Sequence, residues 1–301
     1  MLKQLFELIQ QTLAEWNADR GSRLAAALAY YTVFSLAPLL VVVIAIVGFV
    51  VNQDTVRAEI LQSVTSAVGT DAATFVEDLL VNANRPTEGI VSTIIGILTL
   101  ILGAAGAFGQ LQDALNTIWD VKDPVLDFKA NILTQIKAKL FGFGMVLMVG
   151  FLLLVSLVIS TALSALNTYL TDSTAIVAGL ANALSTLISF GVVMVLFALI
   201  FKYLPRIKVE WRDVWVGAAL TALLFSVGKF LLGLYLANSG AASIYGAAGS
   251  FVLILLWVYY SAQVLLLGAE FTQVYTRRYG SQAAPGQAEQ AIQAAEAALP
   301  T

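Results

Sequence analysis

Side chains that could bind or move a charged ligand are rare in this chain, and two of them stand inside long apolar runs. Lys229 interrupts the run 214–236, and Glu270 stands near the end of the run 247–275. Ionisable groups in such runs are costly to bury and are therefore functional candidates. Together with two polar neighbours on the same runs they form the predicted substrate-binding set: Lys229, Gln263, Glu270 and Tyr235.

Each of the two charges also has a structural interpretation. The long stem of Lys229 could carry its ammonium to the outer membrane interface, instead of forming a cationic site for an anionic ligand. Glu270 could be an exposed or capped carboxylate at the inner interface. Counted at the helical rise per residue, Lys229 lies roughly 24 Å from the start of its run and Glu270 roughly 30 Å from the start of the next run. Because consecutive runs cross the bilayer in opposite directions, the two charges are expected in opposite leaflets. A direct salt bridge between them is not expected.

The chain contains no cysteine and no histidine. Disulfides, zinc sites built on thiolate or imidazole, and catalysis by a histidine base are therefore excluded. We expect no catalytic residue, no metal and no cofactor.

Composition places the chain in a membrane. Hydrophobic residues make up 59% of the sequence and charged residues only 12%, a balance that a soluble domain of this length could not carry on its surface. About twenty apolar residues in a helix cross a bilayer core. We predict an all-α, polytopic membrane helix bundle with six transmembrane helices, at residues 24–51, 90–111, 140–166, 175–201, 214–236 and 247–275.

The segments around the spans have helical patterns of their own. Residues 1–20 predict an amphipathic helix in the membrane interface, outside the membrane domain 21–278. Residues 52–89 predict two short amphipathic helices that cap the bundle on the periplasmic side. The Ala- and Gln-rich stretch 279–301 predicts a flexible cytoplasmic tail. Pro38 predicts a structural hinge in the first span, with a kink near Phe34.

The distribution of lysine and arginine predicts the orientation. Among the loops on one side, the only basic residues are Arg57 and Arg85, whereas the loops on the side of the two termini hold nearly all the others. Because basic loops stay in the cytoplasm, both termini are expected to be cytoplasmic in a multi-pass membrane protein.

Three separated motifs resemble the YihY/BrkB family of bacterial inner-membrane proteins. They are the Ala-Leu-Ala-Tyr-Tyr-Thr-Val-Phe-Ser-Leu-Ala-Pro-Leu run of the first span, the segment Gln110 to Asn116 followed by Trp119, and the stretch from Tyr245 to Glu270. The resemblance covers residues 20–277 and implies six spans with cytoplasmic termini. It also implies a poorly defined activity. Members were once labelled ribonuclease BN, and roles in serum resistance and in export of envelope lipid precursors have been proposed.

Ribonuclease activity does not fit the residues, because the chain has neither a histidine acid or base nor an extended basic surface for RNA. No nucleic acid is therefore expected as a partner. Two hypotheses remain open. In the first, the bundle is a transporter or translocator of a lipid or anionic solute, with membrane lipids as partners. In the second, it is a structural or assembly protein of the envelope that binds a partner through its periplasmic cap.

Overall fold

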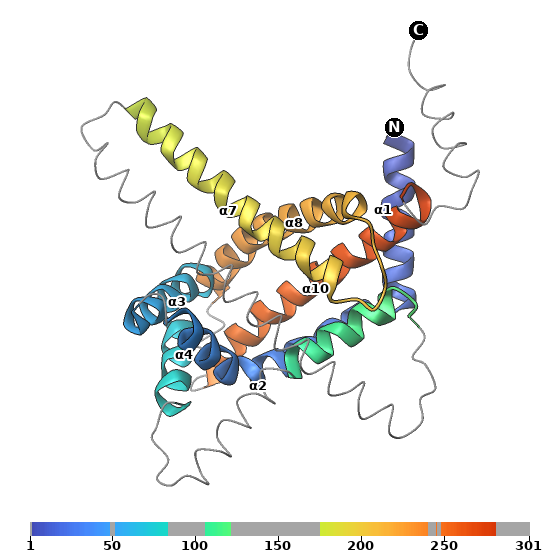
Figure 1. Ribbon diagram of the computed structural model, residues 1–301. Coiled ribbons are helices and arrows are strands. Elements are labelled where there is room, and N and C mark those ends of the chain that lie inside the picture. Colours follow the sequence, from blue (N-terminus) through green and yellow to red (C-terminus); the bar gives the residue numbers. More distant parts are fainter. Residues whose placement is uncertain are drawn as a thin grey trace, which may run out of the picture.

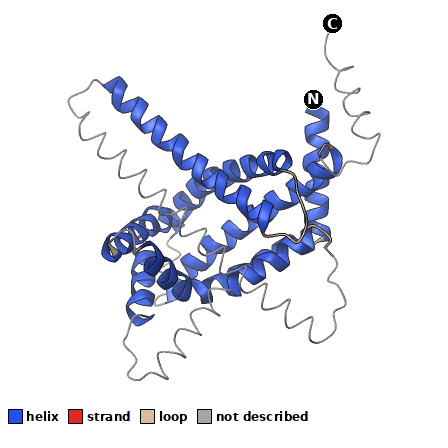
Figure 2. Ribbon diagram, viewed as in Figure 1, coloured by secondary structure: helices blue, strands red, loops and turns tan. Residues whose placement is uncertain are grey.

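The computed structural model describes residues 2–48, 52–83, 106–121, 175–239, 245 and 248–280, and their regular structure is entirely helical (Figures 1 and 2). The predicted fold class, an all-α membrane bundle, is confirmed. Besides an unlabelled helix at 106–118, the helices are α1 (Leu2–Ala18), α2 (Gly21–Val47), α3 (Gln53–Val68), α4 (Thr70–Ala83), α7 (Ala175–Tyr203), α8 (Trp211–Ser239) and α10 (Gly249–Arg278).

Four of the described helices are long and apolar enough to cross a membrane, which makes this a multi-pass membrane protein. They are α2, α7, α8 and α10, and each overlaps a predicted span. The predicted span 140–166 lies outside the described residues, as does most of the span 90–111. The total of six spans therefore stays a prediction, as do the limits of the domain and tail.

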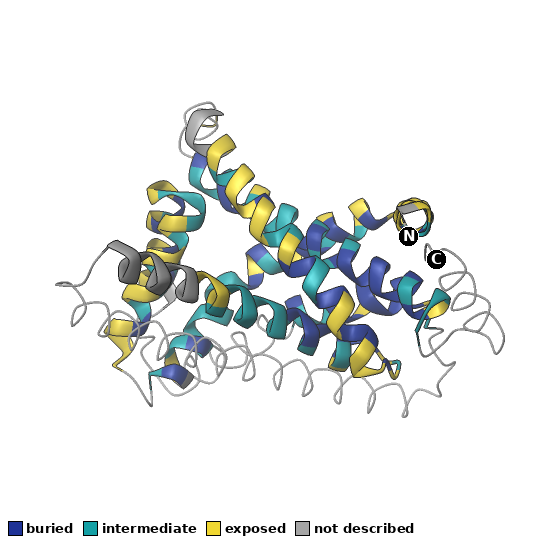
Figure 3. Ribbon diagram, turned by 90° about the horizontal axis from the view of Figure 1, so that it is seen from above, coloured by how far each residue is buried: buried dark blue, intermediate teal, exposed yellow. Residues whose placement is uncertain are grey.

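Helix α10 runs through the middle of the described bundle, with α8 and α2 packed beside it (Figure 1). The core along α8 and α10 is made of small and medium side chains, among them Ala218, Ala222, Ala262 and Leu266. Buried residues follow this central contact, and exposed residues lie on the outward faces of the helices (Figure 3). In a membrane, those outward apolar faces can meet lipid directly.

Two reciprocal contacts between glycine and threonine bring α8 and α10 close together. A Cβ atom placed on Gly217 would lie 1.8 Å from Thr272 Oγ1, and one placed on Gly268 would lie 1.9 Å from Thr221 Oγ1. Each threonine thus occupies space that only a glycine on the other helix leaves open. The pairs also set the register of two antiparallel helices, in which the start of α8 lies beside the end of α10.

Helices α3 and α4 pack on one end of the bundle, where the sequence predicts two short amphipathic helices. They meet at Gly69, whose φ of 110° is a conformation that side chains disfavour. Val76 of α4 is buried in a cluster with Val33 of α2 and Ile254 near the start of α10. We call the pair α3–α4 the cap.

Helix α1 lies at the opposite end of α10. An ion pair joins Arg278 to Glu7, and Leu8 packs with Phe271 and Val274. The other face of α1 exposes large apolar side chains, including Phe6, which is 68% exposed. Such a face suits the predicted placement in the membrane interface.

Helix α2 continues through Pro38 as a single helix from Gly21 to Val47. The proline removes one backbone donor from the helix, and Ser35, which is buried, lies one turn before it. The predicted bend near Phe34 stays a prediction.

Candidate functional site

One face of α10 carries three polar side chains near the C-terminal end of the helix. Glu270, Gln273 and Arg277 are spaced by three and four residues, so they follow one another along the same side of the helix. Gly268 and Thr272 lie on another side, against α8. The polar face therefore points away from α8, and we call these three residues the α10 polar face.

Glu270 is the deepest member of the α10 polar face and is 0% exposed. Neither of its carboxylate oxygens has a hydrogen-bond partner among the described residues. The same is true of Oε1 of Gln273, one turn away. Unpaired polar groups are costly to bury, and a buried charge is far more costly. Three unpaired acceptors in one place fit a bound proton or cation, because either supplies the missing donor or positive charge.

Among the described residues, the charged groups around Glu270 are mostly acidic. It lies within electrostatic reach of Asp19, Glu15 and Asp120, with Arg277 as the opposing cation. An excess of carboxylates lowers the local potential and attracts cations. This surrounding therefore suits a proton or a cation better than an anion at Glu270.

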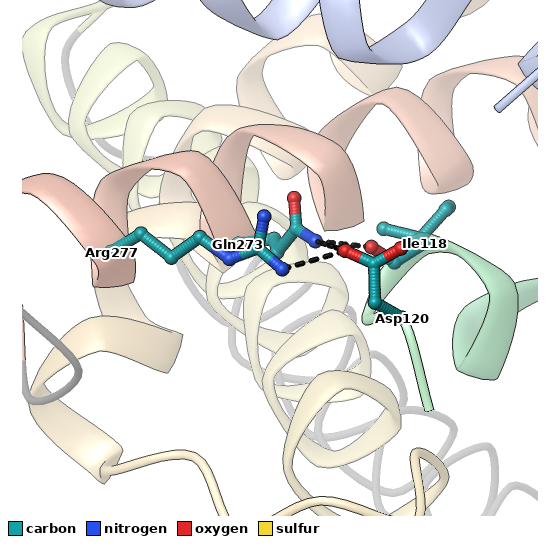
Figure 4. Close-up of polar contacts among 4 residues, drawn as sticks. All are labelled: Ile118, Asp120, Gln273 and Arg277. Atoms are coloured by element: carbon teal, nitrogen blue, oxygen red, sulfur yellow. Dashed lines mark hydrogen bonds and ion pairs between the residues drawn. The ribbon is translucent and has the colours of Figure 1, made fainter. Parts of the chain in front are cut away.

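The outer two members of the α10 polar face connect α10 to the end of the helix 106–118 (Figure 4). Gln273 donates a hydrogen bond to the backbone oxygen of Ile118. Arg277 Nη2 lies 2.7 Å from Asp120 Oδ2, and Gln273 Nε2 lies 3.5 Å from the same oxygen. Glu270 is thus the only residue of the α10 polar face without a described hydrogen-bond or ion-pair partner.

Asp120 is placed by the way its helix ends. The amide of Val121 donates to Asn116 O at 2.9 Å, and that of Asp120 donates to Thr117 O at 3.0 Å. These two backbone hydrogen bonds form a Schellman motif at the C-terminus of the helix. The motif needs one residue in the left-handed backbone conformation, and Asp120 has a φ of 50°. Aspartate tolerates that conformation better than most side chains, and it adds a carboxylate for Arg277.

Two amides of the same helix hold the loop between α7 and α8. Gln112 Nε2 donates to Leu204 O at 2.9 Å, and Asn116 Oδ1 accepts from the Arg206 amide at 2.9 Å. Both amides belong to the motif on which the family resemblance partly rests. Sequence reasoning missed them, together with Gln273, as contact residues; the available signal was a set of amides in an otherwise apolar stretch.

Asp19 lies at the solvent side of this acidic region, between α1 and α2. Burial raises the pKa of its carboxyl group above the ordinary value of 3.8, and the charges of Asp120 and Glu15 raise the pKa further. Arg277 opposes them. Proton affinity is therefore enhanced at Asp19, one of the carboxyl groups within electrostatic reach of Glu270.

The four residues predicted as a substrate-binding set do not meet in one place. Glu270 is buried, which rules out the exposed carboxylate considered as its alternative. Gln263 is half-buried, and Lys229 and Tyr235 are exposed on α8. The phenol of Tyr260 on α10 donates to Leu224 O at 3.2 Å and touches Gly228, so Lys229 lies beside Tyr260 rather than beside Glu270.

Lys229 has apolar and exposed neighbours on α8, such as Phe230 at 70% exposure. No described residue forms an ion pair with its ammonium. That setting matches a lysine that extends along the lipid face toward an interface. Its role as a cationic site stays a prediction. Among the described residues, no group of three or more acidic side chains is arranged to hold a metal ion.

Comparison with known proteins gives a consistent result. A family model described as Virulence factor BrkB matches residues 12–293, which extends beyond both ends of the stretch 20–277 on which the sequence resemblance rests. A UPF0761 membrane protein of Tolumonas auensis is 33% identical over 262 residues, covering 85% of this chain and 81% of the relative. One from Mannheimia succiniciproducens is 27% identical and covers 91% of each chain.

Some relatives are longer than this chain. The match covers 85% of this chain but only 54% of a UPF0761 membrane protein of Rhodospirillum centenum, which is 28% identical. No solved structure matches.

Proposed function

The chain belongs to the virulence factor BrkB family, and we propose that it is a transporter of the bacterial inner membrane that translocates a lipid or an anionic solute. The observation that carries this proposal is the buried carboxylate of Glu270, which has no described hydrogen-bond partner and lies on a helix able to span the membrane. Such a group lowers the stability of a purely structural bundle.

In a transporter that alternates between two states, Glu270 can bind the coupling proton or cation. A carboxyl group that takes up a proton or cation in one state and releases it in the other couples that ion to the movement of a substrate. We therefore assign Glu270 to the coupling ion. The substrate itself would contact other parts of the bundle, since an acidic surrounding repels an anion.

The surrounding contacts support a moving part at this end. Gln273 and Arg277 hold α10 to the end of the helix 106–118, and that helix holds the loop before α8 through Gln112 and Asn116. These links are polar, and each has one partner at or just beyond the end of a helix, so they can break and re-form more readily than a packed apolar core. With both termini cytoplasmic, they would form the inner closure.

The test is lipid transfer by the purified protein in vesicles. Vesicles with and without the protein receive a fluorescent phosphatidylglycerol, and dithionite bleaches the probe in the outer leaflet. We expect the protein to raise the bleached fraction above the half that is exposed in protein-free vesicles, and to do so faster when a pH gradient is imposed. Identical bleaching with and without the protein would contradict lipid translocation.

The alternative, a structural protein that binds a partner through the cap, has its own support. Residues on the outer faces of α3 and α4 are exposed and polar, including Glu59 and Asp78. The two functions separate experimentally, because a scaffold would need the cap but not a chargeable Glu270.

A further inference from the structure

A small cavity lies between the end of α2 and the cap. Its volume is about 150 Å³. The floor is apolar and includes Val41, Ile44 and Leu80, whereas the rim is polar and consists of Gln53, Asp54 and Arg57. Cavities that hold a whole drug-sized ligand have roughly 300 Å³ or more, so this one suits only part of a larger molecule.

The cavity sits where the apolar part of α2 ends. The stretch of α2 that can cross the membrane finishes at Ala45, and the polar rim begins with Gln53 at the start of α3. Gly48 lets the end of α2 approach the start of α3 closely, because a Cβ atom on it would lie 2.4 Å from Gln53 Cγ. With α2 crossing the membrane over this stretch, we expect the floor to lie level with the acyl chains of the bilayer and the rim level with the headgroups.

The rim carries charges of both signs. Arg57 is half-buried, and its Nη2 lies 3.3 Å from Glu77 Oε1 on α4. A guanidinium has five N–H donors, so donors remain for a phosphate after this ion pair is made. Asp54 is exposed, and its carboxylate has no ion pair among the described residues. A cation and a free carboxylate thus face the same cavity.

We propose that this cavity binds the phosphoethanolamine headgroup of a bilayer phospholipid. Arg57 donates to the phosphate, and the ammonium group donates to the Asp54 carboxylate and the Gln53 side-chain oxygen. The apolar floor contacts the start of the acyl chains. A lipid with a glycerol headgroup offers no cation to Asp54, and a choline headgroup has no N–H to donate. The site lies on the cap, and it depends neither on Glu270 nor on transport.

The test measures lipid retained by the full-length protein in detergent. Native mass spectrometry counts bound lipid after addition of phosphatidylethanolamine, phosphatidylcholine or phosphatidylglycerol of equal chain length. We expect the ethanolamine lipid to be retained about tenfold better than the other two, as expected for one additional charged hydrogen bond. Equal retention of all three lipids would overturn the proposal.

Three variants locate the site. Arg57→Gln should reduce retention of phosphatidylethanolamine about tenfold, since it removes the donor to the phosphate. Asp54→Asn should abolish the preference over phosphatidylglycerol. Glu77→Gln is the matched control, because it breaks the same ion pair as Arg57→Gln but leaves the guanidinium in the cavity.

The control separates lipid binding from folding. Glu77→Gln should retain the ethanolamine lipid as well as the unmodified protein does, or better. Thermal unfolding shows whether each variant is folded. If Arg57→Gln is misfolded, Arg57→Lys replaces it, because lysine keeps the charge but lacks the forked set of N–H donors. Wild-type retention by both Arg57→Gln and Asp54→Asn would also refute the site.

Discussion

Glu270 and Lys229 are the two charges that the sequence places inside predicted spans, and their surroundings in the structure differ sharply. Glu270 is fully buried and has acidic neighbours, whereas Lys229 is exposed among apolar side chains. Apolar periodicity identified both residues as unusual. It could not tell which one faces the interior, because neither lies on a strongly amphipathic helix.

Lys229→Met tests the exposed lysine. The substitution keeps the apolar stem and deletes the charge, and Lys229 makes no described ion pair. We expect the free energy of unfolding to change by less than about 0.5 kcal/mol, and lipid transfer in vesicles to stay unchanged. Loss of transfer in a folded Lys229→Met protein would instead establish the cationic site considered from the sequence.

Asp19→Asn tests the acidic region by its pH dependence. The pKa of Asp19 is raised in the native state, so native protein holds this proton to a higher pH than unfolded protein does. Ionisation then lowers stability as the pH rises from the ordinary value of 3.8 through the raised pKa, and the loss is complete above it. Asparagine never ionises, so the variant should melt at a higher temperature at pH 7.

The gain from Asp19→Asn should shrink as the pH is lowered toward 4, where aspartate is increasingly protonated in both states. Asp78→Asn is the matched control for removal of a carboxyl group, because Asp78 lies on the exposed face of α4. A pH-independent difference for Asp19→Asn would show that the carboxyl group is not buried among other acids.

At the scale of the helices, the apolar runs predicted where α8 and α10 lie to within about three residues, because long apolar runs mark membrane helices well. What the runs did not predict is which helix packs against which. The pairing of Gly217 with Thr272 and of Gly268 with Thr221 joins residues far apart in the chain, and small residues occur along most of the spans. The contacts of Gln112, Asn116 and Gln273 were missed for the same reason.

Gly268→Ala tests the contact between α8 and α10. The new methyl group would lie 1.9 Å from Thr221 Oγ1, so the helices or the threonine must shift. We expect a loss of about 1 to 3 kcal/mol of stability, as for other overpacked sites. Adding Thr221→Ala should restore part of it. The measurement is thermal or denaturant unfolding in detergent.

Gly191→Ala is the matched control for that experiment. Gly191 lies in helix α7, which is able to span a membrane, and a Cβ atom there meets no atom of the described residues within 4 Å. Its substitution should change stability little or improve it slightly, since alanine favours helix. If Gly268→Ala were as harmless as Gly191→Ala, the close approach of α8 and α10 would be wrong.

At the scale of the whole molecule, the segments that the charge distribution assigns to the cytoplasm meet at one end of the bundle. Contacts there join α1 to the end of α10, α10 to Asp120, and the helix 106–118 to the loop after α7. The cap lies at the start of α10, which is the other end. The charge pattern and the structure thus agree on which segments share an end of the bundle.

Reporter fusions test which side that is. A reporter active only in the periplasm should be active when fused after Asn84 or Asn238, and silent after Asp123 or Lys208. The reverse pattern would place the termini outside and turn the proposed inner closure into an outer one.

The most direct test of the transport proposal is Glu270→Gln, measured for stability and transfer together. Glutamine keeps the shape of the side chain but cannot exchange a proton or carry a charge. If Glu270 binds the coupling ion, the variant should be as stable as the unmodified protein or more so, because an unpaired buried carboxylate is gone. Its pH-driven transfer of fluorescent phosphatidylglycerol should fall at least about tenfold. A stable Glu270→Gln protein that transfers lipid at the unmodified rate would contradict the account.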